Sequence, residues 1–162
     1  MSSEAPAGWP PDYPRRDETG WISFGAFLIL VAAIYLTTPN IVQEVENFIL
    51  DFRLVQVFDN FSWPIPANSH PVLYAAAQRF CYAFGLVQLG ILGLRFARKS
   101  SVHGKAETFS GVVFWLGAGY VLGMLSEAAL SWLSFIGALI IVVGITIVAR
   151  ALVLMLAPRR PR

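Results

Sequence analysis

The chain has 162 residues, of which 56% are hydrophobic and only 14% are charged. Soluble domains carry charge on about a quarter of their residues, and the mean hydropathy of this chain is high, at +0.61. An aromatic share of 14% excludes disorder along the body of the chain, and a single cysteine, Cys81, excludes a disulfide scaffold. The formal net charge of +2 argues against a nucleic-acid partner. These values indicate a small integral membrane protein.

The chain begins with a proline-rich segment that is followed by an apolar run. We expect residues 1–19 to form a disordered cytoplasmic tail, because they hold four prolines among small polar residues. The run from Trp21 to Thr38 has no charged residue and stops before Pro39. A secretory signal peptide is the alternative, but charges of both signs precede the run and no small-residue cleavage site follows it. We therefore predict a retained membrane helix over about 21–38.

The next segment, residues 39–71, is expected to lie outside the bilayer. Its apolar residues recur at helical spacing and predict an amphipathic helix over about 41–58; they are Ile41, Val45, Phe48, Phe52 and Val55. The polar face of this helix is acidic, whereas interfacial anchors are usually basic. We therefore expect it to cap the bundle or to dock a partner. Phe61 to Pro66 is expected to form a stiff apolar loop, and Pro71 is a favourable first residue for the next helix.

Three further membrane helices are predicted over about 72–96, 108–127 and 132–157. The last two come from one run of about 50 residues, which would reach roughly 75 Å as a single helix and must fold back once. We place the turn near 126–131, where polar side chains interrupt the run. The predicted fold is therefore all-α: an integral membrane four-helix bundle over residues 20–157, with an additional amphipathic helix in the outer loop.

The basic residues indicate how the bundle is oriented, because Lys and Arg collect on the cytoplasmic side of membranes. Residues 39–71 hold one basic residue, Arg53, against several acidic ones. The basic residues elsewhere fall on one side if both termini are cytoplasmic, including those of the tail at 158–162. We predict a multi-pass protein of the cell membrane, whose cytoplasmic contacts with lipid headgroups are made by Arg95, Arg98, Lys99, Lys105 and Arg150.

Polar residues within the predicted spans need an explanation, because a charge at the centre of a membrane helix costs about 2.5–3.5 kcal/mol or more. Gln78 and Gln88 give the second membrane helix a polar face. Arg79 and Glu127 both belong to the outer leaflet, and we expect them to form an ion pair between the second and third membrane helices. The alternatives are an Arg79 side chain that snorkels outward along the helix, a solvated Glu127, and a proton or ion relay. Small residues indicate close helix packing on two faces: Gly90 and Gly93 share the face of Arg79, and Gly119 and Gly123 lie on the third membrane helix.

No catalytic motif accompanies these features. His70 and His103 are predicted on opposite sides of the membrane, and a metal site of His70 with Glu44 or Asp59 has no support from spacing. We therefore expect no cofactor, no metal and no enzymatic activity. The favoured function is a non-enzymatic accessory, packing or assembly protein, with the bilayer and other membrane subunits, or copies of itself, as partners. The alternative is a small oligomeric transporter or channel using the polar face of the second helix, with Arg79 and Glu127.

Overall fold

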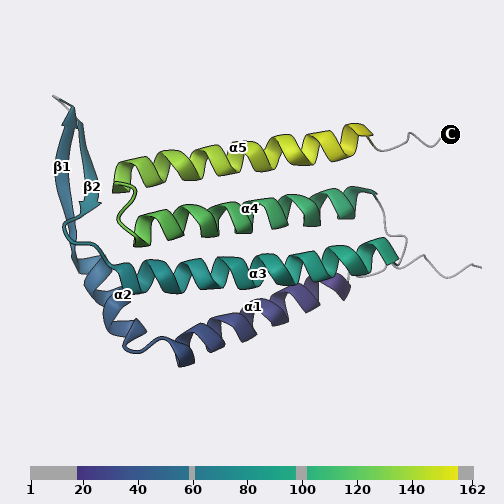
Figure 1. The fold of residues 1–162 in the computed structure, drawn as a ribbon, viewed down its shortest axis with the longest axis horizontal. Helices are drawn as coiled ribbons and strands as arrows, with labels where there is room; N and C mark the ends of the chain where they lie inside the picture. The colour runs from purple at the N-terminus through teal and green to yellow at the C-terminus, as the bar shows by residue number, and fades with distance from the viewer. Residues whose placement is uncertain (1–17, 59–60, 98–101, 157–162) are drawn as a thin grey trace, which may run out of the picture.

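A computed structural model describes residues 18–58, 61–97 and 102–156. Its elements, drawn in Figure 1, are α1 (Glu18–Thr37), α2 (Ile41–Leu50), β1 (Phe52–Phe58), β2 (Phe61–Pro66), α3 (Pro71–Ala97), α4 (Val102–Ser126) and α5 (Trp132–Leu156). Four helices, α1, α3, α4 and α5, are long and apolar enough to cross a membrane. The chain is therefore a mostly helical, multi-pass membrane protein. The predicted tails lie outside the described residues, except that Glu18 and Thr19 already belong to α1.

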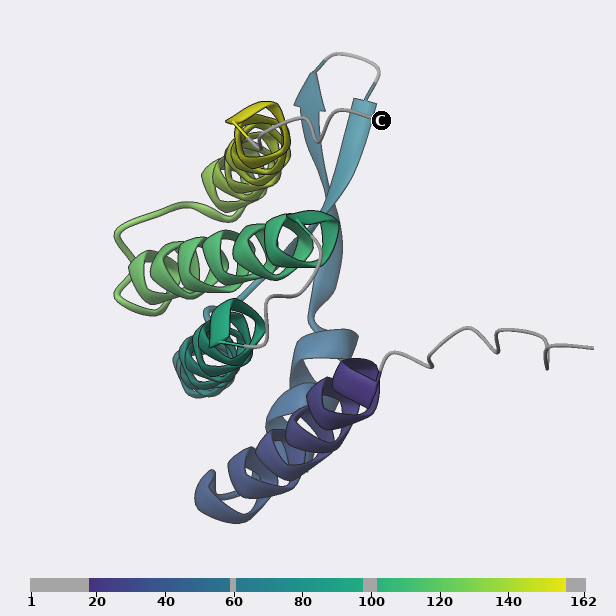
Figure 2. The ribbon, with the colours of Figure 1, turned by 90° about the vertical axis from the view of Figure 1, so that its right-hand side faces the viewer.

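The four long helices pack as successive neighbours in the order α1, α3, α4, α5 (Figures 1 and 2). The tightest packing joins α3 to α4, and α4 to α5 comes next. Consequently α4 is the most enclosed helix, whereas no residue of the Gly20–Thr37 span is buried. We call the end with α2, the hairpin and the α4–α5 turn the hairpin end. The opposite end, where α3 is followed by α4, is the basic end.

The amphipathic helix after α1 is shorter than predicted. α1 stops at Thr37 and α2 starts at Ile41, after Asn40 has turned the chain with a left-handed φ of 56°. The prediction that this helix reaches residue 58 is wrong, because α2 ends at Leu50 and β1 follows. Residues 52–58 are mostly aromatic and β-branched, which suits a strand. The helical spacing of Phe52 and Val55 is also compatible with a strand, so spacing alone could not decide between them.

The expected stiff loop at Phe61–Pro66 is also wrong, because these residues form β2 and pair antiparallel with β1. The register sets Val55 opposite Trp63 and Leu54 opposite Pro64. Pro64 and Pro66 fit in β2 because both strands of a two-stranded sheet are edges. Every second residue of an edge strand directs its N–H away from the partner strand, so a proline there costs no hydrogen bond between the strands. Such a small sheet is marginal by itself, so its position depends on its attachment to the helices.

The α4 helix starts six residues before the predicted position, at Val102 rather than 108. The apolar run predicts where the membrane span begins, but the helix itself begins earlier, with the polar residues that precede the run. The Thr108 hydroxyl donates to the Gly104 carbonyl over 3.0 Å, and the Arg95 guanidinium donates to the same carbonyl from α3. These contacts fasten the start of α4 to the end of α3.

The turn between α4 and α5 lies where it was predicted, after Ser126 and before Trp132. The amide of Ala129 donates to the Met124 carbonyl and that of Ala128 to the Leu125 carbonyl, which is the Schellman pattern that closes a helix. Ala128 takes the left-handed position with a φ of 55°, where glycine is usual. Ser131 then caps α5 by accepting from the Ser134 amide over 3.3 Å.

Candidate functional site

The two glutamines of the predicted polar face lie in contacts between helices. Gln88 donates from Nε2 to the Ser23 hydroxyl of α1 over 3.3 Å. Gln78 lies against Gly123 of α4, where an added methyl group would come within 3.1 Å of its amide carbon. Polar side chains commonly join helices in this way inside membranes. In this chain the two glutamines therefore link α3 to α1 and to α4.

The expected ion pair of Arg79 and Glu127 is absent. Within residues 18–58, 61–97 and 102–156, the ion pairs are those made by His70. Arg79 is exposed on α3, and Glu127 is exposed in the α4–α5 turn. The reason is the helical phase: the α3 residues that face α4 include Gln78 and Tyr82, and Arg79 lies off that face. Glu127 is left to water or headgroups at the hairpin end.

The predicted packing glycines divide into two groups. Gly119 and Gly123 of α4 lie directly against α3; a methyl group on Gly119 would meet the Tyr82 ring at 2.9 Å. Gly90 and Gly93 of α3 are exposed and have nothing within 4 Å of that position. Two glycines that were not predicted to pack also lie in contacts: Gly85 against Leu116 and Gly117 against Val142.

Several of the residues predicted to contact lipid headgroups lie at the basic end. Lys105 lies over the Phe96 ring, with 4.6 Å between Nζ and the ring centroid. Arg150 is exposed near the end of α5. Arg98 and Lys99 lie outside the described residues. A cavity of about 310 Å³ opens at this end, lined by Gly20, Ser23, Gln88, Ile91, Arg95, Glu107, Thr108 and Gly111.

The hairpin end holds a polar cluster of four residues. The sequence could pair His70 with Glu44 only as an unsupported metal site, and no pattern in it indicated Asp51 or Asn68 as their neighbours. His70 is 8% exposed and lies just before α3. Its Nε2 lies 3.2 Å from Asp51 Oδ2, and its Nδ1 lies 3.9 Å from Glu44 Oε2. Asn68 completes the cluster, because its backbone amide and its side-chain amide donate to the two Asp51 oxygens over 2.6 and 2.8 Å. We call His70, Asp51, Glu44 and Asn68 the hairpin anchor, since they join both ends of the hairpin to α2 and α3.

Aromatic rings enclose the hairpin anchor on its membrane side. Phe48 of α2 lies edge-on to the His70 ring, with centroids 5.5 Å apart, and also contacts Tyr74 and Trp132. Trp132 reaches Phe52 of β1 at 6.0 Å. These rings therefore join α2, β1, α3 and α5 around a single histidine. Edge-to-face pairs contribute about 0.5–1.5 kcal/mol each beyond the area that they bury.

The electrostatics of the hairpin anchor favour a charged Asp51. The backbone N–H of Asn68 lowers the pKa of Asp51 below its usual 3.8, and hydrogen bonds from His70 and the Asn68 side chain act in the same direction. Among the described residues, no group of three or more His, Cys, Asp or Glu side chains is placed to hold a metal ion. The anchor can hold the hairpin in place, and the strength of this attachment depends on whether Asp51 is ionised.

No protein-family model, curated protein or solved structure matches this chain. Its function is therefore inferred from its own geometry. Arg79, Gly90 and Gly93 lie on one exposed face of α3, and the two glycines have nothing packed against them within the described residues.

Proposed function

We propose that this chain is a non-enzymatic subunit of a membrane complex, which packs the outward face of α3 against a helix of another membrane protein. The outward face consists of exposed residues that share one side of α3: Arg79, Leu86, Gly90, Gly93 and Ala97. It points away from the faces that contact α1 and α4. Small residues let two helix backbones approach closely, and a polar residue strengthens such a contact.

Arg79 is the observation that carries the proposal. It lies eight residues into α3, about 12 Å along the helix from Pro71, so its backbone is below the membrane surface. A charge there is costly unless it is paired or its side chain snorkels to the membrane surface, and the described part of the chain supplies no ion-pair partner for it. We therefore propose that the partner helix brings a carboxylate to this depth.

A partner of different sequence fits this face better than a second copy. A two-fold axis through the outward face would place equivalent residues near each other. Two Arg79 side chains would then meet at the same depth, and like charges repel strongly in a medium of low dielectric constant.

The basic residues at the basic end support an orientation in the cell membrane that places both termini on the cytoplasmic side.

Photo-crosslinking tests the proposal. A photoreactive phenylalanine analogue placed at Gly90, in the full chain in its own membrane, should form a crosslink to one other membrane protein. The same probe at Gly144 of α5, which also has open space around it, is the matched control and should crosslink only to lipid. Combining the Gly90 probe with Arg79→Glu should reduce the protein crosslink at least about tenfold. Lipid adducts alone at both sites would contradict the proposal.

The transporter alternative has one observation in its favour, the cavity of about 310 Å³ at the basic end. Gln88, Arg95 and Glu107 give this cavity polar walls. The hydrogen bond of Gln88 to Ser23 lies beside it, so a path across the membrane would require α1 to move from α3. Solute or ion flux through liposomes of the purified chain, abolished by Gln88→Leu, would favour this function over the subunit.

A further inference from the structure

We propose that His70 is a pH-sensitive clamp, which holds α2 to the start of α3 when its ring is protonated and releases α2 when the ring is neutral. The protonated ring attracts both Asp51 and Glu44, whereas the neutral ring attracts only Asp51. The clamp lies at the hairpin end, away from the outward face of α3, so it does not depend on the proposed subunit function.

The two nitrogens of the His70 ring face two different carboxylates. Nε2 lies 3.2 Å from Asp51 Oδ2, at hydrogen-bond distance, and Nδ1 lies 3.9 Å from Glu44 Oε2, at ion-pair distance. Only the protonated ring has an N–H group on both nitrogens. The neutral ring keeps one N–H group, which the nearer Asp51 oxygen accepts, and turns an unshared electron pair toward Glu44. Loss of the proton therefore weakens the contact with α2 and keeps the contact with the hairpin.

The other groups around His70 carry no charge near neutral pH. α3 brings the Tyr74 ring, whose centroid lies 6.4 Å from that of His70, and phenols stay neutral below about pH 10. α2 brings Phe48, and Asn68 before α3 has an uncharged amide side chain. Among the described residues, His70 is the only basic side chain that pairs with either carboxylate. The charge of the ring therefore determines how strongly both carboxylates are held.

Protons can reach the ring because a hollow of about 360 Å³ opens beside it. The hollow is lined by Asn47, Leu50, Asp51, Asn68 and His70 itself. Histidine is the side chain whose charge ordinarily changes between about pH 5 and 8. The clamp therefore responds to the pH of the compartment that the hairpin end faces. It holds α2 in mildly acidic solution and releases it in mildly alkaline solution.

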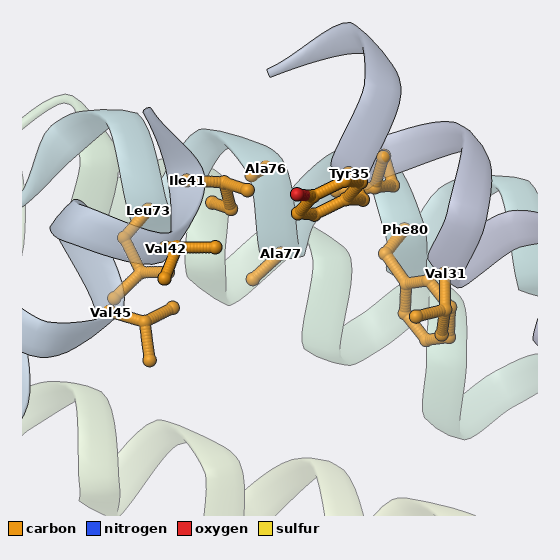
Figure 3. Close-up of a pocket in the computed structure, with 10 residues that line it drawn as sticks. Val31, Tyr35, Ile41, Val42, Val45, Leu73, Ala76, Ala77 and Phe80 are labelled. Carbon is orange, nitrogen blue, oxygen red and sulfur yellow. The ribbon is translucent and has the colours of Figure 1, made fainter. Parts of the chain in front are cut away.

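The packing of α2 leaves it able to move when the clamp opens. None of its residues is buried, and a groove of about 410 Å³ lies between α2, α1 and α3 (Figure 3). Ile41, Val42 and Val45 line this groove from α2. Because the apolar packing beneath this part of α2 is incomplete, its attachment depends more strongly on the contact between Glu44 and His70.

The test measures hydrogen exchange of the α2 amides in the full chain in nanodiscs, at about pH 5.5 and about pH 8. Rates are expressed as protection factors, which remove the intrinsic effect of pH on exchange. Protection in α2 should be at least about fivefold lower at the higher pH, with little change in α4. Glu44→Gln removes the charge that His70 attracts, so the pH effect should fall below about twofold. Glu46→Gln, the matched control, removes an exposed carboxylate from the same helix and should keep the full effect.

A second measurement assigns the effect to His70. The chain has two histidines, and His103→Gln, which replaces the exposed one in α4, should keep the full pH effect. Nitrogen NMR of the His70 ring should show two protonated nitrogens at the lower pH and one at the higher pH. A ring that keeps one protonation state across this range, equal α2 protection at both pH values, or a wild-type pH effect in Glu44→Gln would overturn the proposal.

Discussion

Replacing Gly119 by leucine should disrupt the packing of α3 against α4 and lower the stability of the protein by about 2–3 kcal/mol. A side chain at this position would start within 2.9 Å of the Tyr82 ring and 3.2 Å of the Cys81 Cβ atom. Cys81 is buried, so this part of α3 has little room to yield. The α3–α4 contact is the most extensive one between helices in the structure, so its disruption should affect the whole fold.

Gly144→Leu is the matched control for this prediction. Gly144 is also a glycine inside a membrane span, but nothing lies within 4 Å of an added methyl group there. The leucine should therefore face lipid and should not lower the stability of the protein, since leucine also has the higher helix propensity. Unfolding of both variants can be followed by circular dichroism in the same detergent. Equal destabilisation by the two variants would contradict a packing role for Gly119 against Tyr82, because helix propensity favours leucine over glycine at both positions.

Asp51→Ala should release the hairpin from the helices while leaving the four spans folded. The substitution removes both hydrogen bonds that Asn68 makes to the carboxylate and the contact with His70. Hydrogen exchange should become about tenfold faster or more in β1 and β2, with little change in α4. Glu46→Ala is the control, because it removes an exposed carboxylate from α2. A hairpin that exchanges equally slowly in both variants would mean that the aromatic rings hold it without the anchor.

The same anchor predicts a dependence on pH. Because the pKa of Asp51 is lowered in the folded protein from its usual 3.8, the carboxylate stabilises the attached hairpin at any pH above that value. This contribution is lost as the pH falls through the lowered pKa. Hairpin protection should therefore decline below pH 3.8 in the wild type, where its difference from Asp51→Ala should also shrink. A constant difference down to strong acid would contradict this role for Asp51.

The membrane spans could be predicted from sequence because each depends on a local property, a long run of apolar residues. The fold-back after Ser126 could be predicted for the same reason, since one helix cannot use the whole final run. The end of α2 could not. Phe52 and Val55 suit either a helix or a strand, and the choice depends on pairing with β2, which local spacing does not report.

The residues of the candidate site could likewise be predicted only where the sequence carries a local signal. The spacing of Gly119 and Gly123 marks a close helix contact, and the structure supplies its partner, α3. Gly90 and Gly93 give the same kind of signal, but no atom of the described residues lies within 4 Å of a methyl group added at either position. The hairpin anchor left no local signal, because His70 and Asp51 are separated by 19 residues and by the whole hairpin. His70 and Glu44 could be considered together from the sequence, but no local pattern points to Asp51 or Asn68 as their neighbours.

The central claim is that a different membrane protein binds the outward face of α3. The most direct test is native mass spectrometry of the full chain, extracted from its own membrane in polymer nanodiscs without detergent. We predict a complex that contains one 17.8 kDa chain together with a second, different polypeptide, and we predict that Arg79→Glu removes the second polypeptide. A wild-type mass of the single chain with lipid, or of a whole number of identical chains, would contradict the account.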